Sequence, residues 1–319
     1  MTKKVGVLLS AVLLGLALAG CGKASVSVQD HSVAPSGMAA VIKGKTNQGT
    51  VRYTINGGST KTTKSQSEGY SLTIPAKPYK QTVKVSVKNG NTETVTVAQR
   101  KTIMTYTKFQ TAYNQTLAGE ALSKSNQTKA TNLQDQAAAL KKQSASIQAQ
   151  VKTAKAKLAK GDTSATATLQ DLATKGEALK TQAAKLKATQ ASLAPALKKA
   201  QASVKNDTLP ATAKNGIHTI KTTKHYKVRT NVYNGKLMGA TLIVPISALK
   251  NDTQAKKFAM TFSVLATGVG ANAKHVLKTF SNNSNKKNSS QTTTETIHSN
   301  GVTFSLGYST STLYIYVTK

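Results

Sequence analysis

The sequence predicts a multidomain α+β protein with three folded regions in series: an antiparallel β-sandwich, a long antiparallel α-helical coiled-coil hairpin and an α+β domain. Three observations predict this order. Short alternating strand patterns fill residues 38–107, two heptad repeats without any strand signal fill residues 108–205, and strand and helix patterns mix over residues 206–319. A signal peptide, residues 1–20, and a tether, residues 21–37, precede these regions.

The N-terminal segment has the pattern of a secretion signal. Lys3 and Lys4 give it a positive start, residues 5–18 are apolar and uncharged, and Leu18-Ala19-Gly20-Cys21 ends the run at the only cysteine of the chain. This ending resembles the lipobox of Gram-positive-type bacterial lipoproteins. The resemblance implies cleavage before Cys21 and acyl chains such as palmitate on that residue, which anchor the chain to the outer face of the cell membrane. An uncleaved N-terminal helix and an ordinary cleaved signal are the alternatives, and all three place the rest of the chain outside the cytoplasm.

The tether is polar and contains Pro35, so we expect a spacer there. Beyond it, five short segments rich in β-branched residues alternate apolar and polar positions: 39–42, 50–55, 70–74, 82–87 and 92–97. Turn residues such as Asn56-Gly57-Gly58 and Asn89-Gly90-Asn91 separate them. The alternation predicts a small sandwich with one buried and one wet face per sheet. The strand succession over about residues 38–100 resembles the immunoglobulin-like modules of Gram-positive surface proteins.

Two heptad seams mark the helical region. Small or apolar residues recur at alternating spacings of three and four from Ala130 to Leu158 and again from Leu169 to Val204. Gly161 supplies a helix stop, and Asp162 to Ser164 supply candidate N-caps. We therefore expect an antiparallel hairpin with its turn near residues 161–162 and a second arm about 60 Å long, kinked at Pro195.

Residue size predicts the register of this hairpin. When the numbers of facing residues sum to 323, a large residue meets a small one at most layers, as close packing favours. Examples are Ala154 with Leu169, Ile147 with Gly176 and Leu140 with Ala183, whereas Val151 with Leu172 pairs two sizeable residues. A shift by one heptad is the alternative, and it lengthens the loop.

The C-terminal region combines strands and helices. Strands are expected over 217–228 and 232–244, around Asn234-Gly235, and again over 293–297, 302–306 and 313–317. Between them, Asp252 is the candidate cap of a helix with Phe258 and Phe262 on one face, and Asn272 is the candidate cap of a second helix. This pattern predicts helices on one face of an antiparallel sheet.

The sequence offers little for catalysis. The histidines are scattered and lack acidic or histidine neighbours at metal-ligand spacing: His31, His218, His225, His275 and His298. No nucleophile elbow, zinc-protease or phosphate-loop motif is present. His218 and His225 are expected on opposite faces of one strand. We therefore expect no enzyme activity, no catalytic residue, no cofactor and no metal site, and Cys21 is the single residue with an assigned chemistry.

Charge is the remaining functional signal. The chain has 44 Lys and Arg residues against 11 Asp and Glu residues, and removing Lys3 and Lys4 with the signal leaves 42 against 11, a net charge of +31. Such a field attracts polyanions such as teichoic acid, anionic lipid or extracellular DNA, in a salt-dependent way. The lysines are dispersed without an accompanying aromatic motif, so no sequence-specific nucleic-acid binding is expected.

These observations predict a non-enzymatic interaction or structural module of the cell envelope. A regulator of a cell-wall enzyme and a transporter-associated solute-binding lipoprotein are the alternatives. Solute-binding lipoproteins usually have two α/β lobes, which this sequence lacks. The sequence does not predict the oligomeric state or a specific ligand.

Overall fold

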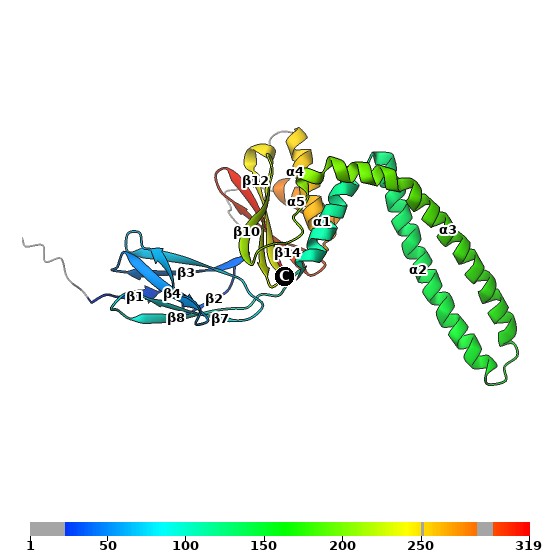
Figure 1. Ribbon diagram of the computed structural model, residues 1–319, viewed down its shortest axis with the longest axis horizontal. Coiled ribbons are helices and arrows are strands. Elements are labelled where there is room, and N and C mark those ends of the chain that lie inside the picture. Colours follow the sequence, from blue (N-terminus) through cyan, green and yellow to red (C-terminus); the bar gives the residue numbers. More distant parts are fainter. Residues whose placement is uncertain (1–22, 250–251, 286–295) are drawn as a thin grey trace, which may run out of the picture. The chain divides into compact units, whose positions relative to one another are not determined.

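The computed structural model describes residues 23–249, 252–285 and 296–319. These residues form a mixed α+β protein with five α-helices and three β-sheets (Figure 1), which confirms the expected mixed class. The chain divides into two compact units. The first contains the described residues 23–74 and 79–99, and the second contains residues 75–78 and the described residues from 100 onward.

The first unit consists of a three-stranded and a five-stranded sheet. The smaller sheet has the order β1-β3-β6 and the larger has the order β2-β8-β7-β4-β5. The bounds of the strands are β1 Val26–Val28, β2 Ser32–Val33, β3 Ala39–Thr46, β4 Thr50–Ile55, β5 Lys61–Lys64, β6 Gly69–Pro75, β7 Gln81–Ser86 and β8 Thr92–Val97. Strands β3, β4, β6, β7 and β8 correspond to the five predicted segments, and β7 ends one residue before the predicted end at residue 87. Inward residues of both sheets, such as Ile42, Leu72, Val83 and Val95, are fully or almost fully buried in one shared core.

The predicted tether, residues 21–37, contains two short strands that were not expected. Residues 26–28 form β1, which pairs antiparallel with β3, and residues 32–33 form β2, which pairs parallel with β8. Val26 is buried in the core of the first unit. The segment is short and surrounded by polar residues, so its alternation is too brief to separate from a polar spacer. Its strand conformation depends on partners that follow it in sequence.

The second unit is built on a seven-stranded sheet. Six strands have the order β10-β11-β12-β15-β14-β13, and β9 also pairs with β12. Their bounds are β9 Met104–Thr105, β10 Gly216–Thr222, β11 Lys227–Tyr233, β12 Lys236–Pro245, β13 Thr296–Ser299, β14 Val302–Tyr308 and β15 Thr312–Thr318. Asn234 and Gly235 both have positive φ, so the predicted turn connects β11 to β12 as a tight hairpin.

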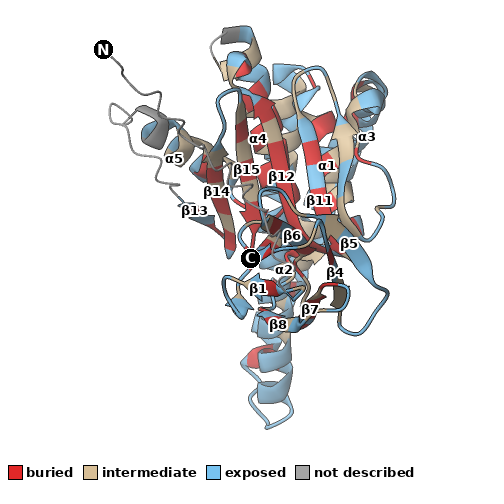
Figure 2. Cartoon of the chain, turned by 90° about the vertical axis from the view of Figure 1, so that its left-hand side faces the viewer, coloured by how far each residue is buried: buried red, intermediate tan, exposed pale blue. Residues whose placement is uncertain are grey.

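Three helices bury one face of this sheet. They are α1 Tyr106–Glu120, α4 Asp252–Gly268 and α5 Ala273–Asn285, with the 3-10 helix η2 Ile246–Leu249 before α4. Phe109, Phe262 and Phe304 are completely buried between helices and strands. Figure 2 shows buried residues along α1, α4, β12 and β15. The backbone N–H of His275 donates to Asn272 Oδ1 at 3.0 Å, which confirms Asn272 as the cap of α5.

The helical region begins differently from the prediction. Residues from 108 onward were expected to belong to the hairpin, but α1 packs into the core of the second unit through Phe109, Tyr113 and Leu117. The helix α1 ends at Glu120, and Ser123 Oγ accepts a hydrogen bond from Asn126 N at the start of the next helix. Aromatic residues at helical spacing distinguish α1 from the alanine-rich seam that follows it.

The two longest helices, α2 Lys124–Leu158 and α3 Ala165–Ser203, run side by side and are joined by a short turn (Figure 1). Gly161 has φ +89°, as a helix stop requires, and Asp162 Oδ1 accepts from Ser164 N at 3.1 Å. Leu172, Ala154 and Ala165 are buried in one cluster with Ile147, Val151 and Leu169. The helix α3 continues through Pro195 and bends in its C-terminal part before the 3-10 helix η1 Lys205–Asp207.

One predicted strand is divided. Residues 217–228 were expected to form a single strand, but β10 and β11 are separated by a turn in which Thr223 Oγ1 accepts from Tyr226 N at 3.1 Å. His218 therefore lies in β10 while His225 lies in the turn, so the expectation that they occupy opposite faces of one strand is wrong. Threonine and tyrosine favour strands, so the strand pattern runs through the turn, which local hydrogen bonds between Thr223 and Tyr226 close.

Candidate functional site

The one residue with an assigned chemistry, Cys21, lies outside the described residues, as does the rest of the lipobox. The lipid anchor therefore stays a prediction from sequence. Within the described part of the chain, none of the helices combines the length and the apolar character that crossing a bilayer requires.

Three of the five histidines make separate local contacts through their rings. His31 Nδ1 lies 3.0 Å from the carbonyl oxygen of Thr94, His218 Nε2 lies 2.9 Å from that of Asn215, and His298 Nδ1 lies 3.1 Å from Thr303 Oγ1. The described residues contain no group of three or more His, Cys, Asp or Glu side chains that could hold a metal ion.

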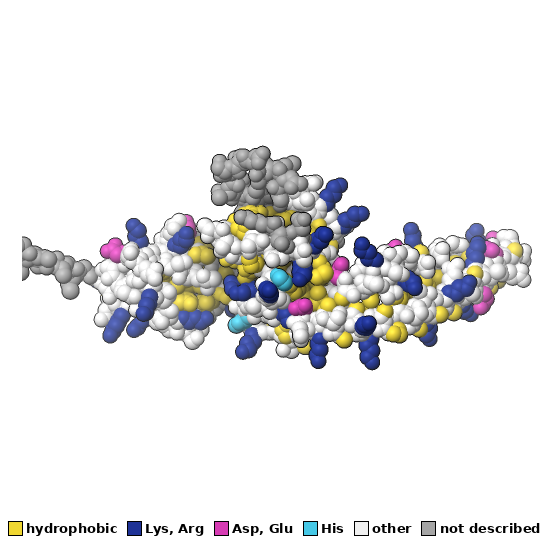
Figure 3. Space-filling view, turned by 90° about the horizontal axis from the view of Figure 1, so that it is seen from above, with side chains coloured by type: hydrophobic (Ala, Val, Ile, Leu, Met, Phe, Trp, Pro, Cys, Tyr) yellow, Lys and Arg dark blue, Asp and Glu magenta, His cyan; other side chains and the backbone are white. Residues whose placement is uncertain are grey.

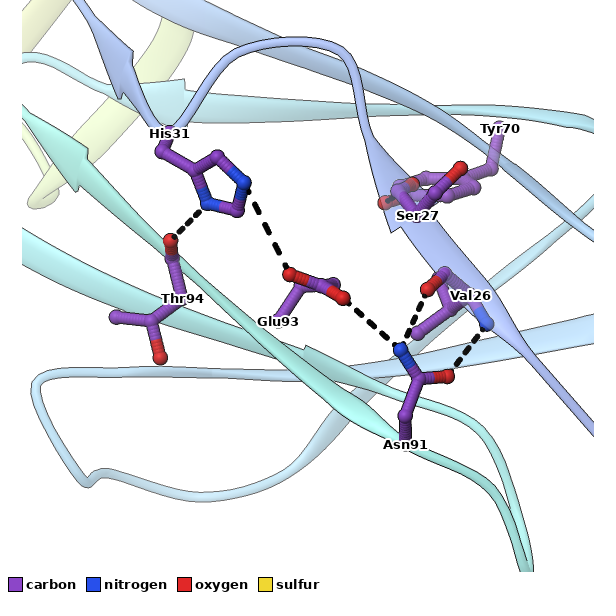
Figure 4. A network of polar contacts seen from close by, with 7 residues as sticks. All are labelled: Val26, Ser27, His31, Tyr70, Asn91, Glu93 and Thr94. Carbon is purple, nitrogen blue, oxygen red and sulfur yellow. Dashed lines mark hydrogen bonds and ion pairs between the residues drawn. The ribbon is translucent and has the colours of Figure 1, made fainter.

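A polar network around Asn91 holds the N-terminal strand β1 (Figure 4). Asn91 Oδ1 accepts from Val26 N, and Asn91 Nδ2 donates to Val26 O, both at 2.8 Å, so the side-chain amide replaces a neighbouring strand. Asn91 Nδ2 also donates to Glu93 Oε1 at 2.9 Å, and Glu93 Oε2 lies 4.0 Å from His31 Nε2. The acidic side chain is thus used to orient an amide, which is a structural role.

Three lysines gather at an open hollow in the first unit. Lys43 and Lys45 are two residues apart in β3 and share its exposed side, and Lys64 ends β5. With Gln29 and Gln66 they line a hollow of about 720 Å³, which we call the lysine hollow. None of the three lysines forms an ion pair with a described residue. Asp30 and Glu68, the nearest acidic residues in sequence, are not among its lining residues.

The floor of the lysine hollow is fixed by a close contact between β3 and β6. The buried Tyr70 side chain passes beside Gly44, and its hydroxyl donates to the carbonyl oxygen of Ser27 at 2.8 Å. Burial, with a smaller contribution from the charge of Glu93, raises the pKa of Tyr70 to about 12. A Cβ on Gly44 would lie 2.0 Å from Ser27 O and 2.4 Å from Tyr70 Oη. Only glycine therefore fits between Lys43 and Lys45.

Sequence reasoning missed the lysine hollow because it looked for runs and doublets of lysine. The signal was Lys43-Gly44-Lys45, where a strand places both ammonium groups on one side. The predicted strand ended at Ile42 and the observed one continues to Thr46, so this pairing was not recognised.

Basic side chains are otherwise spread widely. Figure 3 shows Lys and Arg side chains projecting from every described part of the face that it presents. Two lysines of α3 are paired with acidic neighbours: Lys175 Nζ lies 2.6 Å from Asp171 Oδ2, and Lys180 Nζ lies 2.6 Å from Glu177 Oε1. All four side chains are more than half exposed, so these pairs lie on the solvent-facing side of α3.

Comparisons with known proteins do not assign the chain to a family. No protein-family model matches the chain, and no curated protein matches it significantly. Among solved structures, part of the chain is similar to the FMN-binding beta-glucuronidase from Facaelibacterium prausnitzii L2-6, with 15% identity and a TM-score of 0.21. The match covers 25% of this chain and 12% of that chain, so it carries no argument about fold or activity.

Proposed function

We propose that the protein is a non-enzymatic lipoprotein of the cell envelope, anchored through Cys21 to the extracytoplasmic face of the membrane, that binds anionic polymers such as teichoic acid. The lipobox-like ending Leu18-Ala19-Gly20-Cys21 supports the anchor. Replacing Cys21 with Ser should release the protein from membranes, as measured by fractionation. Retention of the variant on membranes after a high-salt wash would contradict lipid anchoring.

The proposal also includes a finer assignment of the architecture. The first unit is an immunoglobulin-like β-sandwich module, an assignment supported by its two sheets around one shared core. Helices α2 and α3 form an antiparallel coiled-coil hairpin, an assignment supported by heptad seams that meet in one apolar cluster. Such a hairpin would act as a spacer or as a surface for a protein partner.

The lysine hollow carries the polymer-binding proposal. Its three ammonium groups stand around one concave surface without an acidic lining residue, so their fields add instead of cancelling. Gln29 and Gln66 add amide donors for phosphate oxygens. A polymer with one phosphate per repeat can engage several such donors at once, whereas an isolated phosphate ion engages few of them. The remaining lysines supply a weaker, unlocalised attraction.

The test compares two charge-matched triple variants of the chain without its signal and lipid. One variant replaces Lys43, Lys45 and Lys64 with Gln, and the control replaces the exposed Lys141, Lys142 and Lys187 of α2 and α3 with Gln. Binding to immobilised teichoic acid is measured across increasing salt. Each lysine near a polyanion contributes at most about 1 kcal/mol to binding. Because salt screens part of this attraction, the affinity for teichoic acid should fall about tenfold in the first variant and about twofold in the control.

One result would support the proposal, and two would count against part or all of it. A larger loss for the hollow variant, shrinking as salt rises, supports it. Equal losses in both variants would show that net charge alone attracts the polymer, and the hollow would have no special role. Binding that does not depend on salt, or no binding at low salt, would defeat the polyanion proposal altogether.

A further inference from the structure

The second unit contains a small pocket that the polymer-binding proposal does not use. It has a volume of about 300 Å³ and lies where α1, η1, the β10–β11 turn, the end of β12 and α4 meet. At the volume that water occupies in the liquid, it has room for about ten water molecules. This matches a ligand the size of an amino acid, at the lower end of the usual range for binding pockets. We call it the α4 pocket.

One wall of the α4 pocket is apolar and rigid. Leu117, Val244 and Phe258 line it, and all three are buried. The Phe258 ring lies 5.8 Å from the ring of Phe262 and 5.4 Å from that of Phe280, so an aromatic cluster holds its orientation. Met260 also lines the pocket and remains 38% exposed, which gives the apolar wall a side open to solvent. An aliphatic or aromatic side chain would find a preformed surface here.

The polar lining carries both signs of charge. Asp207 of η1 and Lys257 of α4 both line the pocket, and neither forms an ion pair with a described residue. The Asp207 carboxylate lies near a pair of tyrosine hydroxyls, Tyr113 Oη and Tyr226 Oη, which are 3.5 Å apart. Burial is the main reason that the pKa of both tyrosines is raised, and the charge of Asp207 raises it further. Both hydroxyls therefore stay protonated and neutral at physiological pH.

We propose that the α4 pocket binds a small zwitterion with an apolar side chain, of the class of a free leucine or phenylalanine. The ligand ammonium pairs with Asp207, the ligand carboxylate pairs with Lys257, and the side chain packs on Phe258. A ligand with a single charge satisfies only one of the two groups and repels the other, which disfavours simple anions and amines.

The experiment uses leucine, its two single-charge analogues and phenylalanine as a second zwitterion, on the chain without its signal and lipid. Leucine and phenylalanine carry both charges, 4-methylpentanoate lacks the amine of leucine, and isoamylamine lacks the carboxylate. Binding is measured by calorimetry or by ligand-detected NMR. We expect leucine or phenylalanine to bind with a Kd of about 1 mM or below, and each single-charge analogue to bind at least about tenfold more weakly.

Two variants and two matched controls test the assigned groups. Asp207→Asn and Lys257→Gln should each weaken leucine or phenylalanine binding about tenfold, with unchanged thermal unfolding. Lys256→Gln changes the preceding, exposed lysine of α4, and Asp135→Asn changes an exposed residue of α2, so neither should alter binding. Three results would overturn the proposal. They are equal binding of all four probes, a loss of affinity in Asp207→Asn and Lys257→Gln no larger than in the controls, and no binding of either amino acid at a concentration of about ten times the expected Kd. Loss of teichoic-acid binding in the lysine-hollow variant would not affect this result, because different residues carry it.

Discussion

Replacing Gly44 with Ala tests how tightly the floor of the lysine hollow is packed. The added methyl group would lie 2.0 Å from Ser27 O, 2.4 Å from Tyr70 Oη and 2.6 Å from Tyr70 Cζ. All three distances are far shorter than a carbon contact of about 3.5 Å. Two of these atoms belong to a buried tyrosine ring and one to the backbone of β1, so no flexible side-chain end can simply move away.

The expected cost has two parts. Overpacking a well-filled site costs about 1–3 kcal/mol. Moving Tyr70 aside also breaks its hydrogen bond to Ser27 O, worth about 1 kcal/mol. We therefore expect Gly44→Ala to lower the free energy of unfolding of the first unit by about 3 kcal/mol, a large share of the stability of a unit this small.

The assay combines calorimetry with amide hydrogen exchange, because the two units can unfold separately. Exchange should accelerate in β1, β3 and β6 and stay unchanged in the second unit. Gly49→Ala is the control, since a Cβ there meets no atom within 4 Å and its φ is not in the left-handed region. It should change stability by less than about 0.5 kcal/mol. An unchanged transition for Gly44→Ala would refute the close packing that supports the lysine hollow.

Two further predictions concern the helices and the buried tyrosines. In a chain without Cys21, Ile147→Cys with Gly176→Cys should give a disulfide within one chain, as detected by non-reducing gel electrophoresis, and crosslinks solely between chains would contradict the paired helices. Burial raises the pKa of Tyr70 and of Tyr106 to about 12, so the stability that their protonated forms contribute is complete below about pH 10 and is lost as pH rises to about 12. Between pH 8 and pH 11, the free energy of unfolding measured in urea should fall less for Tyr70→Phe than for the parent chain. An equal fall in both would argue against a raised pKa of Tyr70 in the folded state.

The helical seams show what sequence periodicity can predict. Between residues 131 and 158, every residue that is not exposed occupies a predicted seam position: Leu133, Leu140, Ser144, Ile147, Val151 and Ala154. The same holds from residue 166 to 195, with Leu169, Leu172, Gly176, Leu179, Leu186 and Leu193. Each helix faces one main partner there, so spacing along the chain decides burial.

Short elements with distant partners were the ones missed. Strands β1, β2 and β9 have two or three residues each, too few to show a period, and they form because a longer strand offers free backbone groups. The helix α1 was assigned to the wrong region for a related reason. Its aromatic residues pack on a sheet that, apart from β9, is formed by strands that begin at Gly216, and no local pattern indicates that distance.

The two proposed sites differ in the same way. The lysine hollow could have been anticipated, because two of its lysines are neighbours at strand spacing and their shared side follows from the alternation of a strand. The α4 pocket could not, because Asp207 and Lys257 come from a 3-10 helix and an α-helix that are separated in sequence by β10, β11 and β12. Their opposite charges look like scattered surface residues in the sequence and gain meaning only when the fold brings them to one apolar wall. A site formed by such distant residues is also the more selective of the two, since a ligand must match two charges and a shape at once, whereas a row of lysines accepts any flexible polyanion.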